Sequence, residues 1–134
     1  MPKAKMDSGV VHIPGLGALV IGGSGPRGES STVLQDVEIL KFIELDKEEK
    51  MTWTKINPLL KPRIFISAAF LNDSVIVSSA GDETMEILSL PSGQPGQWTL
   101  ITVGIDECKM PYFLNVYRGN MFVSGNLYTI PLVW

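Results

Sequence analysis

Short apolar runs alternate with polar turn residues throughout the chain, and the clearest series lies between residues 58 and 103. Each run has four to eight residues, which is typical of strands and too short for most helices. The polar pair Asn72-Asp73 separates the first two runs, and a Pro/Gly-rich stretch precedes the last. We therefore expect four neighbouring strands of one antiparallel sheet, at Ile64–Leu71, Ser74–Val77, Met85–Leu90 and Gln97–Ile101.

The same pattern continues on both sides of this series. The preceding residues predict four strands, around 8–13, 18–22, 37–45 and 52–56. The polar stretch Ser24–Asp36 lies between the second and third of them, and connections of this length are often functional. The charged run Asp46–Lys50 is expected to form a solvated turn. The following residues predict three strands and no fourth, at 113–117, 121–123 and 127–131.

Overlaying the three series shows that they are repeats. The triplet Glu-Ile-Leu occurs at 38–40 and again at 86–88, and Trp53 and Trp98 each follow it in the fourth run. A basic residue precedes the first run twice, as Lys5 and as Arg63. Small residues end each second run, as Gly22-Gly23, Ser78-Ser79 and Ser124-Gly125. A period of about 45 to 50 residues is typical of β-propeller blades.

The repeated residues are those that packed sheets need. A crowded turn at the end of an inner strand favours glycine or another small residue, because neighbouring backbones come close there. A tryptophan between adjacent sheets buries a large area. We therefore predict structural roles for the small-residue pairs and for Trp53 and Trp98.

These marks, in this order and spacing, resemble the kelch repeat. The chain departs from the family pattern where serines replace the glycine doublet in the second repeat, and where Leu40 and Leu88 stand for its usual tyrosine. The resemblance implies an all-β fold: a kelch-type β-propeller fragment with two full four-stranded antiparallel blades, at 1–57 and 58–103, and most of a third at 104–134. Since propellers usually have four to eight blades, we expect a fragment of a longer protein. The alternative is a ring completed by further copies.

The expected sheets are meanders, in which each strand pairs with the next one along the chain, and this arrangement also predicts a functional face. Alternate connections of such a sheet lie at the same end, which gathers residues 24–36, Gly81–Glu83, Arg63 and Lys109. The resemblance implies that a protein partner binds there, through Arg27, Ser30, Ser31, Arg63, Asp82 and Glu83. For Arg63 the alternative is a tie between neighbouring blades through backbone carbonyls. The family further implies substrate recognition for a cullin-based ubiquitin ligase or actin-associated scaffolding, although no BTB, BACK or F-box segment is recognisable.

Composition narrows the functional classes. Hydrophobic residues make up 45% of the 134 residues and charged residues 19%, which excludes a disordered chain. The net charge of -3 provides no basic field for nucleic acid or an anionic membrane. No apolar run approaches the roughly 18 residues of a spanning helix. The single cysteine, Cys108, cannot form an internal disulfide and fits a cytoplasmic location.

Catalytic and cofactor sites find little support in the sequence. One histidine, His12, and one cysteine cannot supply a zinc site, so we expect no cofactor, no metal and no enzyme activity. One alternative stays open, because Gly23–Gly28 fits the G-x-G-x-x-G pattern of a small nucleotide-binding α/β domain. That site would require a helix to open at this loop, so that the helix N-terminus meets the pyrophosphate.

Overall fold

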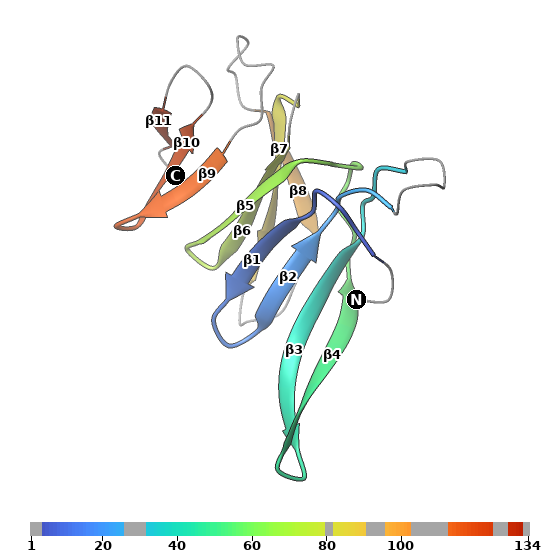
Figure 1. Ribbon diagram of the computed structural model, residues 1–134. Coiled ribbons are helices and arrows are strands. Elements are labelled where there is room, and N and C mark those ends of the chain that lie inside the picture. The colour runs from blue at the N-terminus through green and yellow to red at the C-terminus, as the bar shows by residue number, and fades with distance from the viewer. Residues whose placement is uncertain are drawn as a thin grey trace.

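The computed structural model describes residues 4–25, 32–79, 82–90, 96–102, 113–124 and 129–132, and these residues contain strands but no helix (Figure 1). The all-β expectation is therefore confirmed for the described part of the chain. The strands are β1 (Gly9–Ile13), β2 (Gly17–Ile21), β3 (Val37–Leu45), β4 (Glu48–Ile56), β5 (Ile66–Leu71), β6 (Ser74–Ser79), β7 (Thr84–Ser89), β8 (Trp98–Thr102), β9 (Phe113–Tyr117), β10 (Asn120–Ser124) and β11 (Thr129–Leu132).

The strands form three separate sheets, each a simple meander. The first sheet has the order β1-β2-β3-β4, the second has the order β5-β6-β7-β8, and the third contains β9, β10 and β11. Every pairing is antiparallel and joins strands that are consecutive in the sequence. The two predicted four-stranded antiparallel sheets are thus present, and a third sheet of three strands follows them.

Tight turns explain why the hairpins begin and end where they do. Both residues of Asp46-Lys47, Asn72-Asp73 and Arg118-Gly119 have positive φ values, between 49° and 74°. Two-residue loops of this conformation match the right-handed twist of the flanking strands. The predicted turn over residues 46–50 is therefore too long, because the ladder continues to the pair Leu45 and Glu48.

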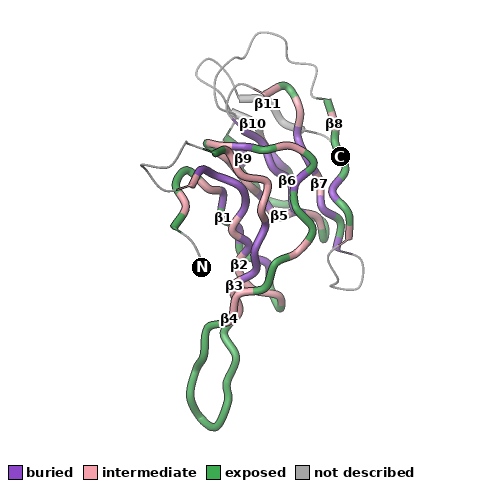
Figure 2. The backbone as a smooth tube through the Cα atoms, turned by 90° about the vertical axis from the view of Figure 1, so that its right-hand side faces the viewer, coloured by how far each residue is buried: buried purple, intermediate pink, exposed green. Residues whose placement is uncertain are grey.

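The hairpin of β3 and β4 is the longest in the molecule's described part and projects beyond the sheets (Figures 1 and 2). Its first half belongs to the core, where Val37 and Ile39 are buried. Its outer half is exposed on both faces and carries large apolar side chains, among them Phe42, Leu45 and Met51. The apolar start of β3 thus lies in the core, and the charged residues near the turn lie in the exposed half of the hairpin.

The sheets stack through their faces, with β1 beside β5 and β5 beside β9. One apolar cluster lies between the first and second sheets, and a smaller one lies between the second and third. The first strands of these two sheets approach closely at Gly9, where an added Cβ would clash with the Ile66 side chain. The larger cluster contains Val11, Ile13, Leu19, Ile21, Val37, Ile39, Leu59, Val75, Val77, Leu88, Leu90 and Trp98.

Strand register shows that the first two sheets are built alike. Leu40 pairs with Trp53 in the first sheet, and Leu88 pairs with Trp98 in the second. The two tryptophans therefore occupy equivalent positions in successive sheets, as the repeat pattern predicts. Trp98 is buried between the sheets, and its indole N–H donates to the carbonyl of Asn57 at 2.9 Å. Trp53 is only half-buried.

Candidate functional site

Three connections meet at one end of the first two sheets: β2 to β3, β4 to β5, and β6 to β7. Backbone hydrogen bonds join the first two connections. The Gly23 N–H donates to the Arg63 carbonyl at 2.9 Å, the Arg63 N–H donates to Leu34 at 3.1 Å, and the Leu34 N–H donates to Gly23 at 2.8 Å. The predicted gathering of Arg63 with the residue 24–36 segment is thus confirmed for the described part of that segment.

The described part of the 24–36 segment begins with a buried residue, although its polar composition suggests an exposed loop. Ser24 is buried and forms isolated bridges with Met6 and with Val33. Gly22 and Gly23 have φ values of 56° and 95°, and a Cβ on Gly23 would lie 2.5 Å from the Met6 carbonyl oxygen. The doublet is therefore needed for both backbone conformation and space, in agreement with its predicted structural role.

Arg63 lies at the centre of this end, and its side chain has no exposed surface. The Nε atom donates to the Glu86 carboxylate at 2.6 Å, and Nη1 donates to the Ser79 hydroxyl and to the Thr84 carbonyl at 3.0 Å. The Nη2 atom donates to the Thr84 hydroxyl at 3.0 Å. The guanidinium thus joins β6 to β7 within the second sheet. The backbone of Arg63 forms hydrogen bonds with the β2–β3 connection of the first sheet.

Glu86 completes the buried network. This carboxylate lies in the middle of β7 with no exposed surface, and its second oxygen accepts the Leu60 N–H. A buried charge is tolerated when it is paired and its remaining hydrogen bonds are satisfied. Arg63 therefore offers no exposed atom to a partner, and its geometry corresponds to a structural tie. The tie differs from the one anticipated, because most of its side-chain bonds reach side chains and only one reaches a backbone carbonyl.

Asp82 connects this buried network to the surface. Its carboxylate lies 2.8 Å from the Lys61 ammonium and 3.8 Å from the Arg63 guanidinium, and it accepts the Thr84 N–H at 2.8 Å. Burial alone would raise the pKa of Asp82. The hydrogen bonds from Lys61 and Thr84 and the Arg63 charge outweigh burial and lower the pKa from 3.8 to about 2. Asp82 is consequently a fixed anion, beside the exposed side chain of Glu83.

The first sheet carries a counterpart of the Arg63 pair. Lys5 and Glu38 are both buried, and their charged groups lie 3.4 Å apart without hydrogen-bond geometry. Glu38 pairs with Val20 as Glu86 pairs with Val77, so the two carboxylates occupy equivalent positions. Sequence reasoning aligned these residues but did not predict the ion pairs. The signal that could have revealed the ion pairs was a glutamate repeated inside an apolar strand, together with a repeated basic residue.

Several predicted site residues lie outside the described residues: Arg27, Ser30, Ser31, Gly81, Lys109 and Gly125. Ser78 and Ser79 lie at the buried end of β6, and Ser124 ends β10. Of the six predicted partner-binding residues, the structure therefore places Arg63, Asp82 and Glu83. It brings Arg63 and Asp82 together directly.

The nucleotide-binding alternative does not fit the strand arrangement. β2 and β3 are antiparallel neighbours, whereas a dinucleotide site requires a strand that leads into a helix of a parallel βαβ unit. Within the described ranges no cluster of His, Cys, Asp and Glu could hold a metal ion. The described residues likewise include no helix with the length and hydropathy to cross a membrane.

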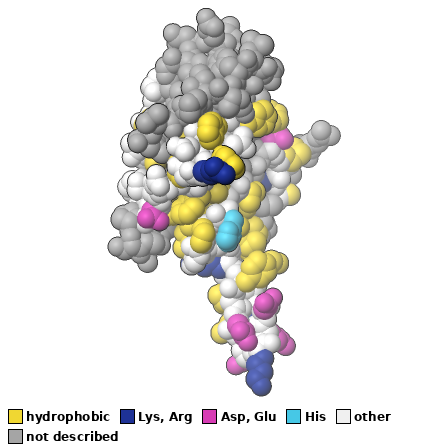
Figure 3. All heavy atoms as spheres, turned by 90° about the vertical axis from the view of Figure 1, so that its left-hand side faces the viewer, with side chains coloured by type: hydrophobic (Ala, Val, Ile, Leu, Met, Phe, Trp, Pro, Cys, Tyr) yellow, Lys and Arg dark blue, Asp and Glu magenta, His cyan; other side chains and the backbone are white. Residues whose placement is uncertain are grey.

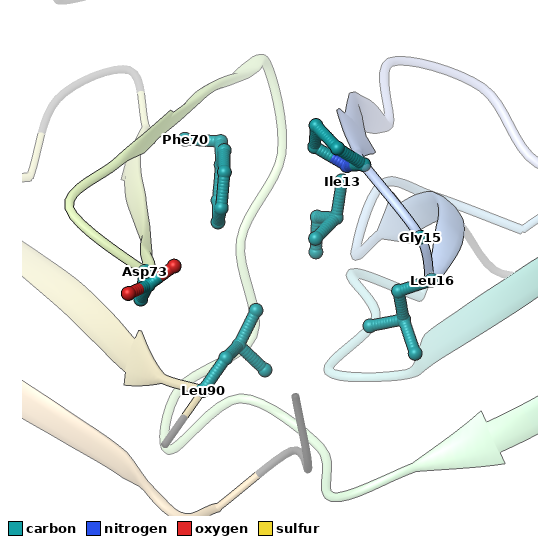
Figure 4. A pocket seen from close by; sticks show the side chains of 7 residues that line it. Ile13, Gly15, Leu16, Phe70, Asp73 and Leu90 are labelled. Atoms are coloured by element: carbon teal, nitrogen blue, oxygen red, sulfur yellow. The ribbon is translucent and has the colours of Figure 1, made fainter. Parts of the chain in front are cut away.

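The opposite end of the sheets carries a cleft of about 370 Å³ between the β1–β2 and β5–β6 turns (Figure 4). Apolar side chains form its walls, including Ile13, Leu16, Phe70 and Leu90. The carboxylate of Asp73 is the single charged group of its lining. This cleft is separate from the Arg63 end.

Neither family models nor curated proteins supply a relative: the chain matches no model of a known protein family and no curated protein sequence. Any family assignment therefore rests on the internal repeat and its geometry.

Proposed function

We propose that this chain belongs to a kelch-type β-propeller and acts as a protein-interaction module. The observation that carries the proposal is the repeated buried pair of a basic residue and a glutamate, Lys5 with Glu38 and Arg63 with Glu86. The two glutamates stand at the same register position of successive four-stranded meanders, which stack with their first strands adjacent. Stacked meanders of this kind form propeller blades.

The partner binds, in this proposal, at the end of the sheets that contains Arg63. Asp82, Glu83 and Lys61 provide the charged surface there. Arg63 is a positioning residue, because it holds Thr84 and Thr84 in turn holds the Asp82 carboxylate. Arg27, Ser30 and Ser31 are proposed to extend the same surface. Fixed charges on a rigid scaffold favour recognition, since little side-chain entropy is lost on binding.

Two biological roles follow from the kelch resemblance and stay proposals: substrate recognition for a cullin-based ubiquitin ligase, and actin-associated scaffolding. Co-sedimentation with filamentous actin tests the second role, and co-purification of a cullin tests the first. Both assays use the full chain and report independently of each other.

A charge-reversal experiment tests the binding surface. Partners captured by the wild-type chain are identified by mass spectrometry, and their affinities are measured for the variant Asp82→Lys/Glu83→Lys. The matched control is Glu48→Lys/Glu49→Lys, which makes the same change of charge on the projecting hairpin at the opposite end. We expect a loss of about tenfold or more for the first variant, equivalent to about 1.4 kcal/mol, and wild-type affinity for the control. Equal affinities for all three chains would refute the proposed surface.

A further inference from the structure

The cleft between the β1–β2 and β5–β6 turns combines an apolar interior with one charged group at its rim. Figure 4 shows Ile13 and Leu16 on one side of this cleft, and Phe70 and Asp73 on the other. Ile13 and Leu90 are buried, whereas Leu16 and Phe70 are half-buried and pack against the larger core cluster. The Asp73 side chain is exposed. A molecule in the cleft would therefore contact hydrocarbon at the base and a carboxylate at the opening.

Main-chain hydrogen bonds hold both walls of the cleft. In the first wall, Gly15 has a φ of 78°, and the Leu16 N–H donates to the Ile13 carbonyl at 3.1 Å. In the opposite wall, Asp73 has a φ of 55°, and its carbonyl accepts the Leu90 N–H at 2.8 Å. The cleft is thus formed by the fold itself, as small-molecule sites usually are.

The Asp73 carboxylate has no cation beside it in the described part of the molecule. Glu38, Glu86 and Asp82 each form an ion pair there, and Asp73 forms none. Phe70 lies in the same wall of the cleft, and the face of an aromatic ring attracts a cation. The charge and the ring both favour a positively charged group over a neutral or a negative one.

We propose that this cleft binds a small organic cation, in which an apolar body carries a primary ammonium group. The ammonium pairs with Asp73 beside the Phe70 ring. The hydrocarbon body displaces water from Ile13, Leu16 and Leu90. The volume of about 370 Å³ fits the range of small-molecule sites, roughly 300–1,000 Å³, which are mostly apolar and have few polar groups to orient the ligand.

Other occupants match the cleft less well. A peptide segment brings backbone donors and acceptors that need partners, and Asp73 is the one polar side chain of the described lining. A calcium ion takes six to eight oxygen ligands, far more than one carboxylate supplies. A neutral apolar molecule makes no use of the charge. The ammonium compound is the ligand that uses both the apolar base and the carboxylate.

Three probes of the same length test the proposal: hexylamine, which is a cation at pH 7, hexanol and hexanoate. Backbone amide chemical shifts of the 134-residue chain are followed by NMR as each probe is added. We expect hexylamine to shift the amides of Leu16 and Asp73. Its Kd should be about tenfold lower than that of hexanol, because an exposed ion pair and a cation–π contact each strengthen binding a few-fold. Hexanoate should bind most weakly.

The decisive variant is Asp73→Asn, because asparagine also tolerates a positive φ. This change should raise the Kd of hexylamine about tenfold, to that of hexanol, and leave hexanol binding unchanged. The matched control is Asp46→Asn, at another tight turn with a φ of 52°. Figure 3 shows acidic side chains along the projecting hairpin that contains this turn, so the control measures non-specific attraction of the cation and should bind like the wild type.

Four results would overturn the proposal: equal Kd values for hexylamine and hexanol, no shifts at the cleft, a hexylamine preference that survives in Asp73→Asn, or one that is lost in Asp46→Asn. Circular dichroism verifies folding. If Asp73→Asn does not fold, added salt decides with the wild-type chain, since screening should reduce the hexylamine preference and an unchanged preference refutes the ion pair. The proposal is independent of the partner surface at the other end, so Asp82→Lys/Glu83→Lys should bind hexylamine like the wild type.

Discussion

The first and second sheets place a buried glutamate at the same position and neutralise it in different ways. In the second sheet, Arg63 reaches Glu86 at 2.6 Å and makes further hydrogen bonds to Ser79 and Thr84. In the first sheet, the Lys5 ammonium lies 3.4 Å from Glu38, and neither Lys5 Nζ nor Glu38 Oε2 has a hydrogen-bond partner among the described residues. Two successive repeats thus carry, at equivalent positions, one ion pair with hydrogen bonds and one ion pair without them.

The difference follows from the chemistry of the two cations. A guanidinium has five donors in a rigid, planar arrangement and can bridge several acceptors, whereas an ammonium is a compact point charge on a flexible stem. Arg63 can therefore join two strands and a connection, while Lys5 only compensates a charge. A buried pair stabilises a fold when its hydrogen bonds are complete, and otherwise desolvation cancels the Coulomb attraction. We infer that the second pair stabilises the molecule and that the first contributes little.

The largest effect is expected for Arg63→Met. This change leaves the Glu86 carboxylate buried without its cation and removes donors from Ser79 and Thr84, so the free energy of unfolding should fall by about 3–5 kcal/mol. Urea denaturation followed by circular dichroism measures the change. Lys5→Met is the matched comparison. It also leaves a buried carboxylate, Glu38, without its cation, but it breaks no hydrogen bond among the described residues, so its cost should be smaller, about 2 kcal/mol. Equal losses in the two variants would contradict the inferred difference.

Replacing each whole pair sharpens the comparison. The double variant Lys5→Met/Glu38→Leu removes an unsatisfied pair from an apolar environment, and its free energy of unfolding should equal or exceed that of the wild type by about 1 kcal/mol. The variant Arg63→Met/Glu86→Leu should instead lose about 2 kcal/mol, since Leu60, Ser79 and Thr84 lose buried partners. Stabilisation by both double variants would show that the Arg63 network is not a structural tie.

The smallest effect concerns pH. The pKa of Asp82 is lowered to about 2 in the folded protein, so its ionised form stabilises the fold above the unfolded-state pKa near 4. That contribution should be lost as the pH falls from about 4 to about 2. The stability difference between the wild type and Asp82→Asn should stay constant above pH 5 and shrink below pH 4. A difference that persists undiminished at pH 2 would contradict the lowered pKa.

The sequence predicted the strands well because strand length, period and turn chemistry are local properties. Asn72-Asp73 predicted a tight turn and the structure has one there, whereas the charged run 46–50 hid a two-residue turn, since lysine and glutamate are also tolerated in an exposed ladder. The candidate site was harder to predict from the sequence than the strands. Arg63 was recognised as a repeat mark, but its burial depends on Glu86, which lies 23 residues away, and no local pattern reveals which polar residues meet.

Double-mutant cycles in both sheets test the account most directly. One cycle combines Arg63→Met with Glu86→Gln, and the other combines Lys5→Met with Glu38→Gln, with unfolding free energies from urea titrations. The cycle isolates the interaction between the two side chains from their separate effects. We predict a coupling of about 2 kcal/mol or more for Arg63 and Glu86, and less than about 1 kcal/mol for Lys5 and Glu38. A coupling between Lys5 and Glu38 as large as that between Arg63 and Glu86 would contradict the account.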